Sequence, residues 1–94
     1  MKVEVEYCGA WGYGPKYRQL ASTIIEAVPS AQCSGKVGRS SSFEVVVDGK
    51  LIYSKLQNGS FPCYSDIAKA VQALKNDETV PEIKEQEQGS CIIL

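Results

Sequence analysis

Apolar and charged residues alternate at the start of the chain. Positions 3, 5 and 7 are apolar and positions 2, 4 and 6 are charged, and this period of two predicts a β-strand with one buried face. Gly9, Gly12 and Gly14 then interrupt the pattern. From Pro15 onward the apolar residues recur at helical spacing as far as Val28. Proline suits the first helical position because its missing N–H would have no partner there, so we predict a helix that begins at Pro15.

The middle of the chain predicts three more strands. Residues 31–37 are a weak strand candidate, whereas residues 43–47 form the clearest strand in the sequence. Asp48-Gly49 predicts a tight hairpin turn, because both central residues of such a turn must accept positive φ. Residues 51–53 then return as the partner strand.

A second helix and a polar tail complete the pattern. Residues 56–62 are irregular, and Ser65 is a good N-cap for a helix with its own apolar stripe. The chain then turns polar and shows no core-forming pattern. We therefore predict one domain, residues 1–78, followed by a flexible C-terminal tail, residues 79–94.

The order of the predicted elements is β-α-β-β-β-α. A strand–helix–strand opening predicts a parallel pair joined by a right-handed crossover, and the hairpin adds antiparallel strands. Charged residues along one face of the first strand indicate that one sheet face is wetter than in a doubly wound fold. We predict an α/β fold: a small two-layer thioredoxin-like domain with a mixed sheet.

Composition narrows the class of protein. A chain of 94 residues suffices for one modest core, and we expect a monomer. A net charge of −1 argues against nucleic-acid binding. The alternating N-terminus is unlike a signal peptide, and no apolar run approaches the roughly 20 residues of a membrane-spanning helix. We expect a cytoplasmic protein with mainly reduced cysteines.

The chain has no histidine and no cysteines at the spacing of metal ligands, so we expect no metal site. Its scattered lysines, Lys16, Lys50 and Lys55, indicate a solvated surface.

Cys8 is the first candidate for chemistry. It leaves the predicted strand just ahead of a helix N-terminus, where backbone N–H groups and the helix dipole favour the thiolate. In a Cys-x-x-Cys pair the second sulfur would stand at position 11, but that residue is Trp11, which has no nucleophilic sulfur. The residues therefore allow sulfenic acid formation, glutathionylation or a trapped mixed disulfide. The alternative is that Cys8 is a small buried residue of the core and Trp11 a core or rim residue.

Two long segments resemble a known family. "YCGAWGYGPKY" and "FEVVVDGKLIYSK" resemble selenoprotein W, in which selenocysteine stands at the position of Trp11. "SKLQNGSFP", "NDETV" and "CIIL" resemble more closely the migration and invasion enhancer branch of that family, whose motif is Cys-x-x-Cys. The resemblance implies a thioredoxin-like fold and a glutathione-linked thiol or selenol redox function in cell redox homeostasis, with an antioxidant role. It implies Cys8 and position 11 as the catalytic pair, glutathione as co-substrate rather than bound cofactor, and 14-3-3 or other signalling proteins as partners.

Trp11 departs from the pattern of this family. The selenocysteine codon UGA differs by one base from the tryptophan codon UGG, so one hypothesis is that Trp11 marks an altered selenocysteine site. The other is that the chain is a natural member that has lost its resolving group. In both cases the chain as written should be inactive in disulfide exchange, and whether it is a glutathione-dependent oxidoreductase depends on the native residue at position 11.

Two further cysteines lie inside the predicted domain. Cys33 lies in the weak strand after the first helix, a region where selenoprotein W has a glutathione-linked cysteine. Its offset from the preceding proline differs, so Cys33 is either a redox candidate or a packed strand thiol. Cys63 precedes the second helix, and no motif supports a function for it.

Cys91 begins the C-terminal sequence Cys91-Ile92-Ile93-Leu94, a C-a-a-X ending that favours geranylgeranylation. The polar run before it supplies the accessible segment that this modification needs. One prenyl chain gives only reversible membrane binding, and no polybasic run assists it here. An incidental apolar C-terminus is the alternative.

These observations leave two functions open. The first is a small cytosolic thiol or selenol redox protein of the selenoprotein W type that associates reversibly with membrane through Cys91. The second is a prenylated, non-catalytic adaptor in signalling or cell migration. Trp11 in an exposed loop would suit the adaptor, because large rigid aromatic residues are favoured as binding anchors.

Overall fold

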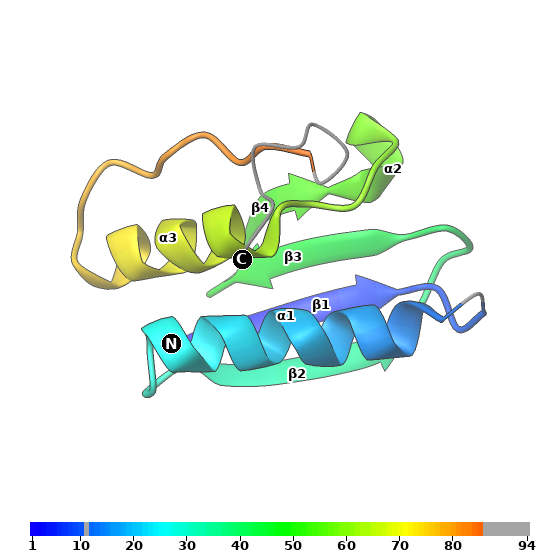
Figure 1. Cartoon of the computed structure of the whole chain (residues 1–94), viewed down its shortest axis with the longest axis horizontal. Coiled ribbons are helices and arrows are strands. Elements are labelled where there is room, and N and C mark those ends of the chain that lie inside the picture. Colours follow the sequence, from blue (N-terminus) through cyan, green and yellow to red (C-terminus); the bar gives the residue numbers. More distant parts are fainter. Residues whose placement is uncertain (11, 86–94) are drawn as a thin grey trace.

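The structure is a computed structural model that describes residues 1–10 and 12–85. Seven elements follow one another along the chain (Figure 1). They are β1 (Lys2–Tyr7), α1 (Tyr13–Ala27), β2 (Gln32–Val37), β3 (Phe43–Val47), β4 (Lys50–Ser54), α2 (Lys55–Asn58) and α3 (Tyr64–Lys75).

The strands form one mixed sheet in the order β2-β1-β3-β4. β1 runs parallel to β2 and antiparallel to β3, and β3 pairs with β4 in a hairpin. Asp48 and Gly49 both have positive φ, 49° and 84°, as the predicted hairpin turn requires. The weak strand candidate is β2, which lies at one edge of this sheet. Because the sheet contains both parallel and antiparallel pairs, the predicted mixed sheet is confirmed.

The two long helices lie on the same face of the sheet, α1 over β1 and β2 and α3 over β3 and β4 (Figure 1). Apolar side chains from β1 and β3 point into this layer and meet the apolar stripes of the helices. The predicted small two-layer α/β domain is thus confirmed, and the arrangement is compatible with a thioredoxin-like domain. The side chains that are completely inaccessible include Val3, Leu20, Ile24, Phe43, Val45, Ile67 and Val71.

Three local details differ from the sequence-based expectation. The segment expected to be irregular contains the short helix α2, which Ser54 caps by accepting a hydrogen bond from the Gln57 amide at 3.2 Å. Helix α1 begins two residues before Pro15, which still occupies the first turn, where N–H groups need no helical partner. Helix α3 begins at Tyr64 with Cys63 as its N-cap, two residues before the predicted N-cap Ser65.

Part of the predicted tail is described and contacts the domain. The Cys63 amide donates to the Lys84 carbonyl at 2.8 Å, and the Lys84 amide donates to an Asp66 carboxylate oxygen at 3.0 Å. Ile83 packs against the core. The boundary between domain and tail stays a prediction, and residues 86–94, including Cys91, lie outside the described residues.

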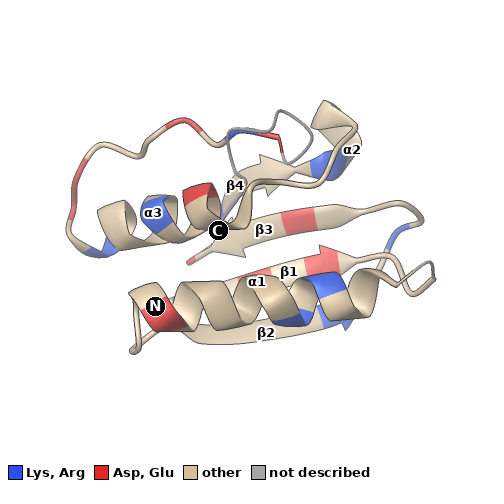
Figure 2. Ribbon diagram, viewed as in Figure 1, with Lys and Arg blue, Asp and Glu red and all other residues tan. Residues whose placement is uncertain are grey.

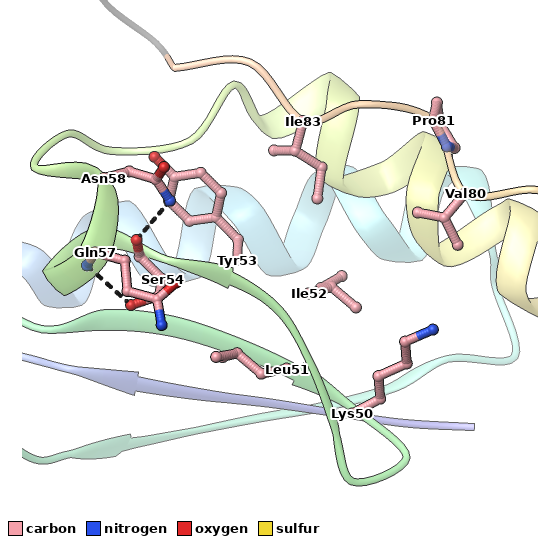
Figure 3. A pocket seen from close by; sticks show the side chains of 10 residues that line it. All are labelled: Lys50, Leu51, Ile52, Tyr53, Ser54, Gln57, Asn58, Val80, Pro81 and Ile83. Carbon is pink, nitrogen blue, oxygen red and sulfur yellow. Dashed lines mark hydrogen bonds between the residues drawn. The ribbon is translucent and has the colours of Figure 1, made fainter.

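A groove of about 350 Å³ also runs along strand β4, and Val80, Pro81 and Ile83 form one of its walls (Figure 3). In Figure 3, Ile83 and Val80 lie on one side and Ile52 and Leu51 on the other, with Gln57 and Asn58 of α2 closing one end. Among residues 1–10 and 12–85, no helix has the length and apolar character needed to span a membrane.

Candidate functional site

The site begins where β1 ends and the chain turns toward α1. The Cys8 amide donates to the Ser42 carbonyl at 3.0 Å, which ties the first residue after β1 to the loop before β3. Gly9, Ala10 and Gly12 are exposed, and Gly12 adopts a left-handed φ of 76° at the start of the helix. Trp11, the other predicted member of the catalytic pair, lies outside the described residues.

Backbone donors surround the sulfur of Cys8. Hydrogen bonds from the amides of Ala10 and Ser41 lower the pKa of the Cys8 thiol, and the positive charge of Lys55 lowers this pKa further. Burial acts in the opposite direction, since Cys8 is only 6% exposed. These groups therefore favour the thiolate relative to an ordinary cysteine, at a thiol that is buried and belongs to the hydrophobic core cluster.

The loop of residues 38–42 carries one of these donors and has a fixed shape. Ser41 has a positive φ of 63°, an unusual conformation for a residue other than glycine. Its neighbour Ser42 is fully buried, and the Ser42 hydroxyl donates to the Arg39 carbonyl at 2.7 Å. Arg39 in turn binds Glu6 of β1 with its backbone amide at 2.7 Å and with Nε at 2.9 Å. The loop is thus fastened to β1 on both sides of Ser41.

Glu44 is a buried carboxylate that the sequence-based reasoning missed. It is 5% exposed, and its Oε2 accepts the amides of Phe43 at 3.1 Å and Lys55 at 2.9 Å. The Ser54 hydroxyl donates to its other oxygen. A single acid in the strongly apolar run "FEVVV" is the signal that could have identified it, because a buried charge needs partners.

Lys55 and an aromatic cluster lie beside Cys8. The Lys55 Nζ is 5.4 Å from the Tyr13 ring centroid and 5.2 Å from that of Phe61. The Phe61 ring also contacts Tyr13 and Phe43 edge to face. Lys55 is therefore half-buried rather than part of the solvated surface that the sequence predicted. Figure 2 shows basic positions on α1, on α2 and on the loop between β2 and β3 at this end of the molecule.

The structure does not bring Cys33 to Cys8. Cys33 pairs with Val3 at the beginning of β1, whereas Cys8 follows the end of that strand. At about 3.3 Å per residue the two positions are roughly 16 Å apart along the strand, and a disulfide needs Cα atoms within about 7 Å. Burial raises the pKa of the Cys33 thiol, so its environment favours the neutral form.

Cys63 has a structural position. It is 1% exposed at the N-cap of α3, and its sulfur lies 3.2 Å from the Ser65 hydroxyl. Within residues 1–10 and 12–85, no three Cys, Asp or Glu side chains gather closely enough to hold a metal ion.

The sequence of the chain is similar to those of known proteins in one family. The pattern of the Rdx family matches residues 2–73. Migration and invasion enhancer 1 from Bos taurus is 33% identical over 94 residues, which cover 100% of this chain and 81% of the relative. Selenoprotein W from Ovis aries is 42% identical over 77 residues, which cover 78% of this chain and 88% of the relative. The resemblance to selenoprotein W is thereby confirmed, and the chain belongs to the Rdx family.

Proposed function

We propose that this member of a family of small redox-type proteins acts as a glutathione-linked thiol or selenol redox protein through Cys8 and position 11. The environment of Cys8 carries the proposal: backbone hydrogen bonds from Ala10 and Ser41 lower the pKa of its thiol, and its amide is tied to the Ser42 carbonyl at 3.0 Å. Thiolate is the form of cysteine that attacks disulfides. Glutathione is the proposed co-substrate, with no bound cofactor.

The chemistry of the first step needs only Cys8. The Cys8 thiolate attacks one sulfur of glutathione disulfide, a Cys8–glutathione bond forms, the original S–S bond breaks, and one glutathione thiolate leaves. A thiol or selenol at position 11 would then lose its proton and attack the Cys8 sulfur, releasing the second glutathione and closing an 8–11 bond. Two electrons thus pass from the pair to glutathione disulfide. Tryptophan cannot carry out the second step, so this chain should stop at the mixed disulfide.

Replacing Trp11 with cysteine tests the proposal. Trp11→Cys should convert a stable Cys8–glutathione adduct into an 8–11 disulfide with no adduct, because the resolving thiol lies three residues away. Peptide mapping without reductant, after exposure to glutathione disulfide, distinguishes the two products. The matched control is Trp11→Ser, which changes the same residue without supplying a sulfur and should keep the adduct. If Trp11→Cys accumulates the same adduct as the parent, Cys8 and position 11 do not form a redox pair.

The names of two relatives favour a second function. Two proteins named migration and invasion enhancer 1, from Bos taurus and Mus musculus, align with 100% and 98% of this chain. These names, with Cys91 as the proposed prenylation site, support a cytoplasmic adaptor that associates reversibly with membrane and binds signalling proteins such as 14-3-3. A pKa of Cys8 at its ordinary value would favour this adaptor over the redox protein.

A further inference from the structure

Lys55 is held in place by contacts of its backbone amide and of its ammonium group. Its backbone amide donates to Glu44, whose carboxylate is buried and also accepts the Ser54 hydroxyl. Its ammonium group lies over the rings of Tyr13 and Phe61 at 5.4 and 5.2 Å from their centroids. An ammonium held over aromatic faces is attracted to them and loses part of its freedom. The charge of Lys55 is therefore confined to the end of the sheet where Cys8 lies.

The same ammonium contacts the loop that supplies an amide to Cys8. The Lys55 Nζ donates to the Ser41 carbonyl at 3.3 Å. Ser41 has a positive φ, a conformation that is unfavourable for a residue with a side chain. The next carbonyl along the loop, that of Ser42, accepts a hydrogen bond from the Cys8 amide at 3.0 Å. Lys55 and Cys8 thus bind adjacent carbonyls of one strained loop.

We propose that Lys55 is the positioning residue of Cys8: it holds the Ser41 amide against the sulfur and places a positive charge beside it. This inference rests on the proposed function, in which Cys8 reacts as thiolate. Lys55 does not touch the reacting partner and acts through the loop and its charge.

The other charged groups near this end of the sheet are already engaged. Arg39 is paired with Glu6 at 2.9 Å and lies 3.9 Å from Glu44. Glu44 accepts hydrogen bonds from Ser54 and from the first residues of α2. Lys16 lies over the Phe61 ring at 4.5 Å from its centroid, and no contribution of Lys16 to the pKa of Cys8 is seen. Lys16 is therefore a matched control, a lysine on the same aromatic ring without a contact to the Ser41 loop.

The experiment measures alkylation of Cys8 by iodoacetamide from pH 5 to 10 in the full chain, with the Cys8 peptide quantified by mass spectrometry. In Lys55→Met the Cys8 rate at neutral pH should fall by about threefold to tenfold, the size expected when a thiolate loses a nearby cation and a donor. At high pH the rates of parent and variant should converge, because both are then thiolate. Lys55→Arg should recover most of the rate, and Lys16→Met should match the parent.

Each outcome has a separate meaning. If the parent Cys8 titrates at its ordinary pKa, the proposed redox function fails. If the parent pKa is low and Lys55→Met follows the parent profile, the redox proposal stands and the inference about Lys55 is overturned. If Lys55→Met does not fold, the salt dependence of the pKa of Cys8 in the parent protein tests the same inference. Raising the salt concentration from 0.01 to 1 M should raise the pKa of Cys8 by screening Lys55, and an unchanged pKa would contradict the role of its charge.

Discussion

Glu6 and Arg39 show how one ion pair supports the candidate site. The Arg39 guanidinium and amide hydrogen-bond the Glu6 carboxylate and lower the pKa of Glu6 to about 2. A Cβ on neighbouring Gly38 would overlap the Glu6 side chain, so a larger residue at position 38 would force the Glu6 carboxylate to move relative to Arg39. The pair therefore helps to set the position of the loop that carries Ser41.

The low pKa of Glu6 predicts a dependence of stability on pH. Between about 4.5 and 2 the unfolded chain binds a proton at Glu6 that the folded protein does not, so this contribution to stability is lost as the pH falls through that range. For a pair that is partly exposed the loss is at most about 1 kcal/mol. Urea unfolding of the parent and Arg39→Gln at pH 7, 4.5, 3 and 2 measures it.

The difference between the two proteins, rather than either curve, is the readout, because other carboxylates also titrate in acid. Arg39→Gln should be less stable than the parent at pH 7, and the difference should disappear near pH 2. Lys36→Gln is the control, since it removes the positive charge of the cross-strand neighbour of Glu6 without removing one of the Arg39 hydrogen bonds to the Glu6 carboxylate. Parallel curves for the parent and Arg39→Gln would show that the pair contributes nothing.

At the scale of elements, the contact between α1 and β2 depends on a residue without a side chain. Tyr7 of β1 and Tyr17 of α1 stack with ring centroids 5.5 Å apart and planes at 9°. A Cβ on Gly35 of β2 would lie 2.8 Å from Tyr17 atoms and 2.9 Å from Tyr7. The stacked rings therefore occupy the space that a side chain at position 35 would need.

Gly35→Ala should accordingly destabilise the domain by about 1–3 kcal/mol, the usual cost of overpacking a well-packed contact. Gly14→Ala is the matched control: its Cβ would meet the Arg18 Nη1 at an ordinary 3.6 Å, and alanine favours the helix by up to about 1 kcal/mol. Denaturant unfolding should rank the proteins with Gly14→Ala at or above the parent and Gly35→Ala below it. A Gly35→Ala protein as stable as the parent would mean that the rings move aside at no cost.

The elements that could be predicted are those with a local pattern. The alternation in β1, the helical spacing after Pro15 and the Asp48-Gly49 turn each act within a few residues, so the sequence predicts the sheet and the two long helices. Helix α2 has only four residues, too few to show a period, and its start depends on the carboxylate of Glu44 eleven residues earlier. Tertiary contacts decide such an element.

Of the candidate site, too, only the part with a local sequence pattern could be predicted. Cys8 could be found because a strand, a glycine-rich turn and a helix surround it in sequence. The groups that tune it come from distant positions: Ser41 on a loop after β2 and Lys55 after β4. Lys55 looks like a surface lysine in the sequence because nothing nearby reveals the rings of Tyr13 and Phe61. Only the folded chain brings these groups to Cys8.

At the scale of the whole molecule, the two proposed activities lie in separate parts of the chain. Cys8 and its donors belong to the sheet end that carries α2 and the 38–42 loop. Cys91 belongs to the segment after Glu85, and the last described residues are tied to residues 62–66 by the contacts of Lys84. None of the groups that lower the pKa of Cys8 comes from the residues near Glu85.

This separation predicts that membrane association and thiol chemistry can be removed independently. Cys91→Ser should abolish the membrane-bound fraction in cells, because each buried CH₂ of a prenyl chain contributes about 0.8 kcal/mol and no basic run replaces it. The same variant should leave the pH profile of Cys8 alkylation unchanged. Cys8→Ser should do the opposite, keeping the membrane fraction while losing the glutathione adduct. Equal partitioning of the parent and Cys91→Ser would reject prenylation, and a changed Cys8 profile in Cys91→Ser would show that the tail reaches the site and that the two activities are coupled.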